Sequence, residues 1–166
     1  HRDINQEKKY QDRLKLSASV FEQASEGIFI LDKKLNYVET NPKYEQMTGL
    51  DKQSILNKQL FEITKEDKQH HYNFHLSILE TLYEEHEYEG EFQETYLSDK
   101  SCFLWLHINA VKDDLDRVIN YIGIVSDQTE RKHQEQHLSY LTNYDPLTDL
   151  PNRFYYHQQL HQYLMN

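Results

Sequence analysis

Histidine is the residue type in this sequence with the greatest capacity for chemistry, and the chain has 10 of them in 166 residues. His71 and His75 lie four residues apart in a stretch whose pattern predicts a helix, and Asp67 precedes His71 by the same interval. Side chains four apart share a helix face, where imidazole and carboxylate groups can hold a metal ion. Asp67 and His75 are about 12 Å apart along the axis, at about 1.5 Å per residue, so one ion cannot join all three. A solvated polar helix face is therefore favoured over a metal site.

The sequence contains no other group of residues whose types and spacing are typical of a catalytic site. Cys102 is the single cysteine, which excludes a disulfide framework or a cysteine zinc site within one chain and favours a reducing, cytoplasmic setting. It falls at the start of a predicted strand and is expected to be a small buried residue rather than a reactive thiol. Four isolated glycines cannot form a phosphate loop, and Glu84-Glu85 and Asp113-Asp114 are expected to be solvated charge runs. We expect no enzymatic activity from this stretch of chain.

The composition limits the partners. Eighteen basic against 28 acidic residues give a formal charge of −10, which argues against nonspecific binding to nucleic acid or to anionic membranes. No stretch approaches the ~20 apolar residues that would cross a bilayer. The aromatic share of 13% is too high for a disordered chain. One folded domain with short appendages is therefore expected, and the start at His1 and the end within a helical pattern suggest a fragment of a larger protein.

The hydrophobic pattern predicts an α+β fold, in which an antiparallel sheet carries its helices on one face. Asn41 and Pro42 start one helix and Gly49 ends it. The expected order along the core is strand 27–32, strand 35–40, short helices 42–48, 51–57 and 59–64, helix 66–85, and strands 88–97, 102–111 and 118–125.

The run from Cys102 has two contrasting faces. One face is aliphatic and is expected to wall a core or pocket, with Leu104, Leu106, Ile108 and Ala110. The other face carries Phe103, Trp105, His107, Asn109 and Val111, and its two aromatic rings are too much apolar area to leave in water. We expect either an N-terminal helix over 3–25, whose narrow stripe includes Tyr10, Leu14, Ser17 and Phe21, or a second copy of the chain to cover it.

A second polar helix is predicted over 127–142, immediately after the last strand. Asp127 or Thr129 could cap its start, and Leu138 and Leu141 are its plainly apolar residues. Such a helix buries little, so it is expected to be a linker or one half of a coiled coil.

Residues 20–132 resemble a PAS domain, the sensory module of bacterial signalling proteins. The resemblance rests on Gly27–Asp32, on Val38-Glu39-Thr40-Asn41-Pro42 with Met47-Thr48-Gly49, on Tyr88–Phe92, on Ser98–Ser101, and on Tyr121–Lys132. The last stretch, with Asp127-Gln128-Thr129-Glu130-Arg131, resembles the PAC-type motif that joins a PAS sheet to its output helix. Lys100 stands where glycine is usual, and Gln128 replaces an aliphatic residue. The resemblance implies a five-stranded antiparallel sheet, a PAS core over 26–126, a capping or dimerisation helix over 1–25 and a signalling helix over 127–142.

Residues 143–154 resemble the opening of a GGDEF domain, the diguanylate cyclase module. Asp145-Pro146-Leu147-Thr148 and Leu150-Pro151-Asn152-Arg153 carry the resemblance, with Asp149 in place of the usual glycine. It covers only the first helix of that domain, over 143–166, so this stretch by itself makes no cyclic-di-GMP. The implied parent is a diguanylate cyclase controlled by the PAS module as a homodimer, with or without a phosphodiesterase domain. Signal transmission is expected at Asp127, Thr129 and Arg131, and the dimer or helix-cap face at Leu14, Phe21, Phe103 and Trp105.

The resemblance leaves the ligand open. In haem-binding PAS sensors the axial histidine lies on the long helix, where His71 stands here, with Phe74 in place of the usual tyrosine. Photosensory relatives need an Asn-Cys-Arg run, which this chain lacks. An unidentified small organic ligand, or no ligand at all, is the default expectation, with haem as the alternative. The candidate pocket residues are Phe29, Ile30, Tyr44, Phe61, His71, Phe74, Ile78, Leu104, Leu106, Ile108 and Ile124.

Overall fold

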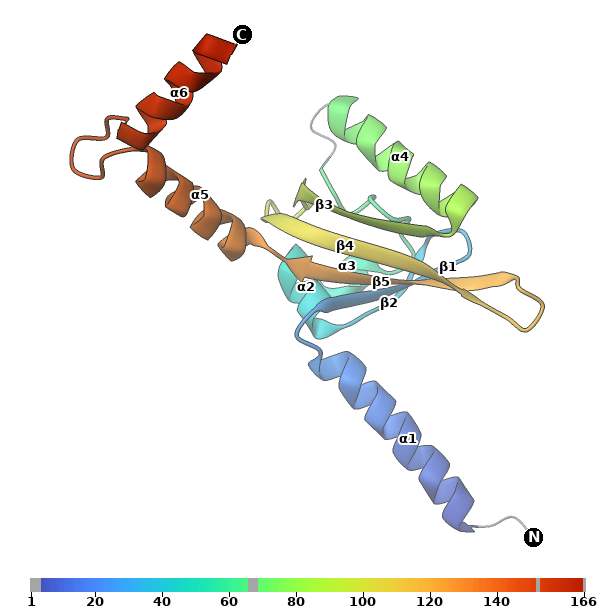
Figure 1. The fold of residues 1–166 in the computed structure, drawn as a ribbon. Coiled ribbons are helices and arrows are strands. Elements are labelled where there is room, and N and C mark those ends of the chain that lie inside the picture. Colours follow the sequence, from blue (N-terminus) through green and yellow to red (C-terminus); the bar gives the residue numbers. More distant parts are fainter. Residues whose placement is uncertain (1–3, 66–68, 152, 166) are drawn as a thin grey trace. The chain divides into compact units, whose positions relative to one another are not determined.

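The computed structural model describes the backbone of residues 4–65, 69–151 and 153–165, and the side chains of these apart from 69–71, 153–157 and 165. The chain divides after Asp127 into two compact units, which are described separately. Figure 1 shows the elements in order along the chain.

The first unit is built on one five-stranded antiparallel sheet, which confirms the expected α+β fold. The strand order across the sheet is β2-β1-β5-β4-β3, so the first and last strands of the sequence pair in its middle. Pairing of Phe29 with Gly123 and of Leu106 with Val125 sets the register on the two sides of β5. The strands are β1 (Gly27–Asp32), β2 (Tyr37–Thr40), β3 (Glu87–Thr95), β4 (Ser101–Lys112) and β5 (Val118–Asp127).

Three helices cover one face of this sheet: α2 (Pro42–Thr48), α3 (Lys52–Ile55) and α4 (Gln69–Glu85). Their apolar sides meet alternate residues of β1, β4 and β5 in a single core. Tyr44 and Ile78 from the helices, and Phe29, Leu104 and Ile108 from the strands, are all buried there. The predicted inward face of the run from Cys102 is therefore confirmed.

The local signals at α2 are confirmed. The Oδ1 of Asn41 accepts a hydrogen bond from the Tyr44 amide, Pro42 opens the helix, and Gly49 ends it at a φ of 70°. The predicted helices at 51–57 and 59–64 are largely wrong, since only α3 is helical. Asn57 and Phe61 have φ values of 67° and 78°, which a right-handed helix does not admit. Bridges to Asn36 and Tyr96, which adjoin β2 and β3, hold this segment in turns instead.

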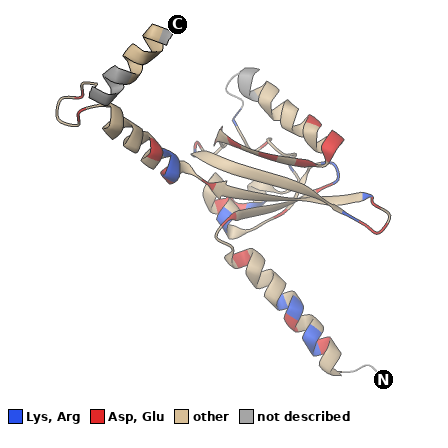
Figure 2. Cartoon of the chain, in the orientation of Figure 1, with Lys and Arg blue, Asp and Glu red and all other residues tan. Residues whose placement is uncertain are grey.

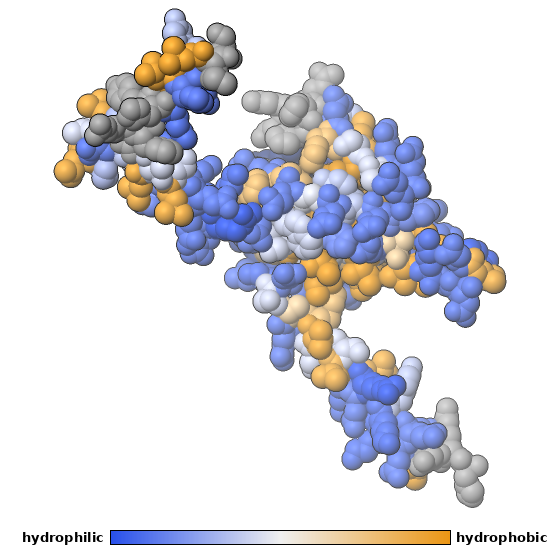
Figure 3. All heavy atoms as spheres, viewed as in Figure 1, coloured by the Kyte–Doolittle hydropathy of each residue, from blue (hydrophilic) through white to orange (hydrophobic). Residues whose placement is uncertain are grey.

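The N-terminal helix α1 (Ile4–Gln23), one of the two covers expected for the outer face of the sheet, does not lie over that face. None of its described residues is buried, and Leu14 is 55% exposed. Phe21 is half-buried, and its carbonyl accepts a hydrogen bond from the Nδ2 of Asn41. Only the end of α1 borders the sheet, where Leu16 and Val20 line a groove with Ile28 and Ile124. Figure 3 shows apolar side chains gathered where α1 leaves the sheet.

The outer face of the sheet is half-buried along its centre and acidic at one edge. Phe103 and Trp105 are half-buried there, and Ile122, which pairs with Asn109 further along β4, is 39% exposed. The Nε1 of Trp105 donates to a carboxylate oxygen of Glu89 at 3.1 Å, and acidic side chains recur along β3 (Figure 2). Within the first unit, apolar area therefore remains available on this face for a partner.

The second unit consists of α5 (Thr129–Asn143) and α6 (Arg153–Met165) with a loop between them. Gln128 is the N-cap residue of α5 and its side chain makes no capping hydrogen bond, so neither Asp127 nor Thr129, the two expected caps, occupies the N-cap position. Leu138 and Leu141 are exposed on α5. Tyr140 stacks on Tyr144 at the end of the helix with 5.1 Å between ring centroids. Among the described residues, no helix has the length and apolar character to cross a membrane.

Candidate ligand pocket

A cavity lies between the sheet and the segment that joins α3 to α4. Six of its lining residues are aromatic, four are aliphatic and two are polar. They are Phe29, Tyr37, Tyr44, Phe61, Phe92 and Tyr96, then Leu60, Leu104, Leu106 and Val125, and finally Thr64 and Glu94. The walls thus come from all five strands or their ends and from the turns around Phe61, and four of the six rings belong to β1, β2, β3 and α2.

The cavity is small in this conformation. It offers about 20 Å³ to the centre of a water-sized sphere, whereas one water needs roughly 10–15 Å³ by the same measure. It therefore has room for about one water molecule. A haem or flavin ring does not fit these residues as they stand.

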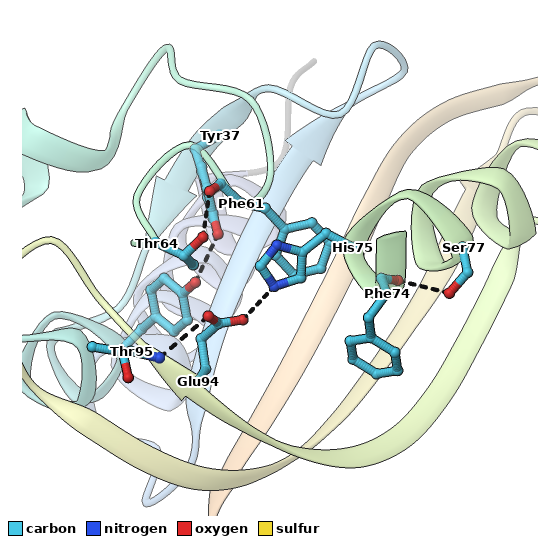
Figure 4. Close-up of polar contacts among 9 residues, drawn as sticks. Tyr37, Phe61, Thr64, Phe74, His75, Ser77, Glu94 and Thr95 are labelled. Carbon is cyan, nitrogen blue, oxygen red and sulfur yellow. Dashed lines mark hydrogen bonds and ion pairs between the residues drawn. The ribbon is translucent and has the colours of Figure 1, made fainter. Parts of the chain in front are cut away.

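Two hydrogen-bonded pairs bring polar groups into this otherwise apolar region. The hydroxyls of Tyr37 and Tyr44 are 2.7 Å apart. The Nε2 of His75 lies 2.7 Å from the Oε2 of Glu94, and both side chains are buried. Figure 4 shows the His75 and Glu94 side chains pointing toward each other from α4 and β3, with Tyr37 and Thr64 nearby. Buried polar groups destabilise the fold unless they are hydrogen-bonded. The pairing therefore lowers the free-energy cost of keeping these four polar side chains inside the core.

Phe61 completes the site beside His75. The two rings are stacked, with 4.0 Å between centroids and 4° between planes. Phe61 holds a φ of 78°, a region that costs non-glycine residues stability and is retained where the surroundings demand it. The Thr64 hydroxyl donates to the Phe61 carbonyl at 2.6 Å and supports this turn. The stacking therefore depends on a strained turn rather than on a helix.

Burial raises the pKa of the three cavity tyrosines Tyr37, Tyr44 and Tyr96, with smaller contributions from neighbouring groups, among them the Glu94 carboxylate. We predict that these three phenols stay protonated in the folded protein when exposed tyrosines ionise near pH ~10. A tyrosine whose pKa is higher in the folded than in the unfolded protein contributes stability. This contribution is fully present below the pKa of the unfolded chain and is lost as the pH rises toward the pKa of the folded protein. Ultraviolet titration should show three tyrosines ionising only on unfolding, with stability falling above pH ~10. Titration of all 13 tyrosines in one step while the fold persists would contradict this.

The structure brings together five of the pocket residues expected from sequence: Phe29, Tyr44, Phe61, Leu104 and Leu106. Two others, Ile78 and Ile108, are fully buried in the core and do not line the cavity. Phe74 is half-buried and packs edge-on against Phe92, 5.1 Å away between centroids. His71 lies in α4, but its side chain is outside the part of the chain that the structure describes.

Ile124 and Ile30 were expected to line the pocket, and this expectation is wrong. Side chains alternate along a strand, and Tyr121, Gly123 and Val125 are the residues of β5 that face the core. Ile124 therefore points to the opposite face, where it lines the groove beside α1. The apolar run at 121–125 does not itself reveal this parity, because both faces of the strand are apolar.

The expectation of a solvated polar face is wrong for His75. It is buried because its partner Glu94 is 19 residues away on β3, a contact that spacing along a helix does not show. The burial of Glu94 could have been inferred from the sequence, because alternation along β3 puts Glu94 on the same inward face as Phe92. A carboxylate at an inward position needs a partner. Asp67 lies outside the described residues, and no group of three or more potential metal ligands occurs among the residues described.

Cys102 is buried as expected, and its Sγ donates to the Met47 carbonyl at 3.4 Å. Burial raises the pKa of this thiol, with a smaller contribution from Asp127. A raised pKa leaves little thiolate, so Cys102 is a packing residue of the core.

Comparison with known proteins shows which fold family this architecture resembles. Residues 21–133 match the model of the PAS fold family. A solved RNA-binding light-oxygen-voltage receptor is similar with a TM-score of 0.64 at 21% identity, over 77% of this chain and 36% of that one. The PAS domain of a Colwellia psychrerythraea protein gives 0.61 at 16% identity, over 72% and 100%. The Rhodobacter sphaeroides LOV protein gives 0.60 at 17% identity, over 77% and 73%.

One curated relative also matches, the uncharacterized protein sll1895 of Synechocystis. It is 55% identical over 42 residues, which are 25% of this chain and 6% of the relative's length. The chain therefore spans only a small part of that protein. The solved structures show the same fold at low identity, and the family model covers most of this chain. This chain belongs to the PAS fold family.

Proposed function

We propose that this PAS domain is a sensory module that binds a small ligand in the cavity described above and relays its occupancy to an output domain. The observation that carries the proposal is the buried polar pair of His75 and Glu94 at the wall of an aromatic-lined cavity. A core built only for stability is better served by apolar residues of the same shape. Family membership supports a sensory or regulatory role rather than an enzymatic one for this domain.

The relay follows from the strand register. Val125 lines the cavity, and β5 continues from it to Asp127, which pairs with Leu104 of β4, another lining residue. Helix α5 begins at Thr129 directly afterwards, and the Nε of Arg131 donates to the Oε1 of Gln128 at 2.6 Å. A ligand that separates β4 from β5 thus acts on the residues that enter α5. It controls output only if the two arrangements differ in ligand affinity, where ~1–3 kcal/mol gives roughly 5–150-fold control.

We further propose that the output is a diguanylate cyclase domain, so that the sensor controls the level of cyclic-di-GMP. The support is the resemblance of Asp145–Thr148 and Leu150–Arg153 to the opening of that domain, after a PAC-type motif at the end of the sheet. In the structure residues 145–151 form turns: the Asp145 carboxylate accepts a hydrogen bond from the Leu147 amide, and the Asp145 carbonyl accepts one from the Asp149 amide. Helix α6 begins at Arg153.

Filling the cavity should abolish ligand sensing. Leu106→Phe adds a ring to the cavity wall, whereas Ile122→Phe adds one to the outer face of the sheet and serves as the matched control. In a thermal-shift screen against a metabolite panel, the wild type and Ile122→Phe should be stabilised by the same compound and Leu106→Phe should not. A compound at 100 times its dissociation constant stabilises by about 2.7 kcal/mol. If the compound shifts the melting temperature of all three proteins equally, the ligand binds outside this cavity and the pocket proposal is wrong.

We also propose that a second copy of the chain covers the outer face of the sheet at Phe103 and Trp105, with Leu14 of α1 in the contact. The support is the apolar area left exposed on this face and on α1. Light scattering should therefore report a dimer, and Phe103→Ser with Trp105→Ser should shift it to monomer with the fold retained by circular dichroism. A wild type that remains monomeric at high protein concentration would contradict this contact.

A further inference from the structure

The cavity is lined by one buried carboxylate side chain and by aromatic rings. Glu94 is only 4% exposed, and six aromatic side chains line the same space: Phe29, Tyr37, Tyr44, Phe61, Phe92 and Tyr96. Neither lysine nor arginine is found among the described lining residues. A carboxylate together with six aromatic rings favours a positive guest over a negative one.

Glu94 has acceptor capacity left for a ligand. Its Oε2 is 2.7 Å from the Nε2 of His75, and its Oε1 accepts the Thr95 amide at 3.2 Å. A carboxylate only accepts hydrogen bonds, so with Glu94 in that form the Nε2 of His75 is the donor of the contact drawn in Figure 4. Two oxygens offer about four acceptor positions, and the described contacts occupy two of them. A ligand that donates a hydrogen bond or carries positive charge complements what remains.

The aromatic residues that line the space come from several elements and form two groups. Phe29 lies 5.4 Å from Tyr37 and 5.0 Å from Tyr44 between ring centroids, and Phe61 stacks on His75. Ring faces attract organic cations, and aromatic cages of this kind recognise amines and quaternary ammonium groups. The negative charge of Glu94 also reaches the phenols around it, since it adds to the rise that burial causes in the pKa of Tyr44 and Tyr96.

We infer that the ligand of this cavity is a small organic cation, an amine or quaternary ammonium compound, held by the Glu94 carboxylate and by the surrounding ring faces. The inference rests on the proposed function as a ligand sensor and names the chemical class of the ligand. Because the space at rest holds about one water molecule, a larger cation enters by displacing the Phe61 ring. Phe61 and Phe92 are the two half-buried rings among the six, and of these Phe61 stands on a strained turn, so it is the ring that moves most readily.

Matched pairs of probes test the charge directly on the wild-type protein. Methylammonium, tetramethylammonium and choline are each titrated beside an uncharged analogue of similar shape: methanol, tert-butanol and 3,3-dimethylbutan-1-ol. Chemical shifts of the Val125 and Leu106 methyl groups report binding in the cavity. At least one cation should bind at least about tenfold more tightly than its uncharged partner. Uncharged analogues that bind as tightly as the cations would overturn the inference.

Variants of two glutamates on the same strand locate the charge. Glu94→Gln removes the buried charge and keeps an oxygen for His75, and it should weaken the cation by about tenfold or more while leaving the uncharged analogue unchanged. Glu91→Gln, exposed on the opposite face of β3, should leave both unchanged. If Glu94→Gln does not fold, the paired probes on the wild type decide alone. Pocket binding only by uncharged or anionic compounds refutes the cation class and preserves ligand sensing, whereas no binding of any probe or metabolite refutes both.

Discussion

Replacing Gly123 by alanine is expected to destabilise the PAS core by about 1–3 kcal/mol, the usual cost of forcing a methyl group into a packed core. Gly123 sits opposite Phe29 in the pairing of β1 with β5, and a Cβ at this position would overlap the Phe29 ring. The ring is 1% exposed, so it cannot swing out to water and must move into the cavity that it lines. Urea unfolding of the first unit should show a lower midpoint with an unchanged slope.

A matched glycine separates this clash from a general effect of alanine. A Cβ at Gly90, in β3, would meet only the hydroxyl end of Tyr88, which is half-buried and can turn away. Gly90→Ala should therefore be neutral or slightly stabilising, because alanine loses less backbone entropy than glycine on folding. Adding Phe29→Leu to Gly123→Ala should recover part of the loss, as expected for two residues in contact. If both alanine variants unfold at the wild-type midpoint, the close approach of Phe29 to β5 is wrong.

Replacing Asn41 by alanine is expected to cost about 2–4 kcal/mol, the sum of a lost helix cap and of buried groups left unpaired. The side chain is fully buried and makes four hydrogen bonds. Its Oδ1 accepts the amides of Ile28 and Tyr44, and its Nδ2 donates to the carbonyls of Phe21 and Glu26. One side chain thus joins the end of α1 and the start of β1 to α2, and alanine supplies none of these partners. Calorimetry should show a clear fall in the melting temperature.

The N-cap of α3 provides the control for this substitution. Asp51 caps α3 through a hydrogen bond from the Ser54 amide, but it is exposed, so water replaces the lost contact. Asp51→Ala should lower the melting temperature much less than Asn41→Ala. Hydrogen exchange at the Ile28 amide adds a second measure, since this amide should lose protection only in the Asn41 variant. Equal losses in the two variants would show that Asn41 acts as a simple cap and does not join three elements.

Local patterns in the sequence were enough to predict the five strands, α2 and α4 in their order along the chain, and the fold family. The signals for these elements are local: an apolar run at 27–32, alternation at 102–111, and Asn41, Pro42 and Gly49 around α2. Each depends on residues within a few positions of one another. Such signals survive in the tertiary structure because β4 and α2 each bury one face against the same core. The inward face of β4 was therefore predictable, and with it Leu104 and Leu106 of the cavity.

The chemistry of the site depends on contacts between residues that lie far apart in the sequence. The pairing of His75 with Glu94, the hydroxyl pair of Tyr37 and Tyr44, and the stacking of Phe61 all join different elements. The turn at Phe61 also replaced a predicted helix, because contacts with neighbouring strands outweighed its weak helical pattern. Spacing along one helix or strand specifies which side chains share a face, but not which side chain from another element meets them. A buried charge and its partner are therefore visible only once the sheet and helices have packed.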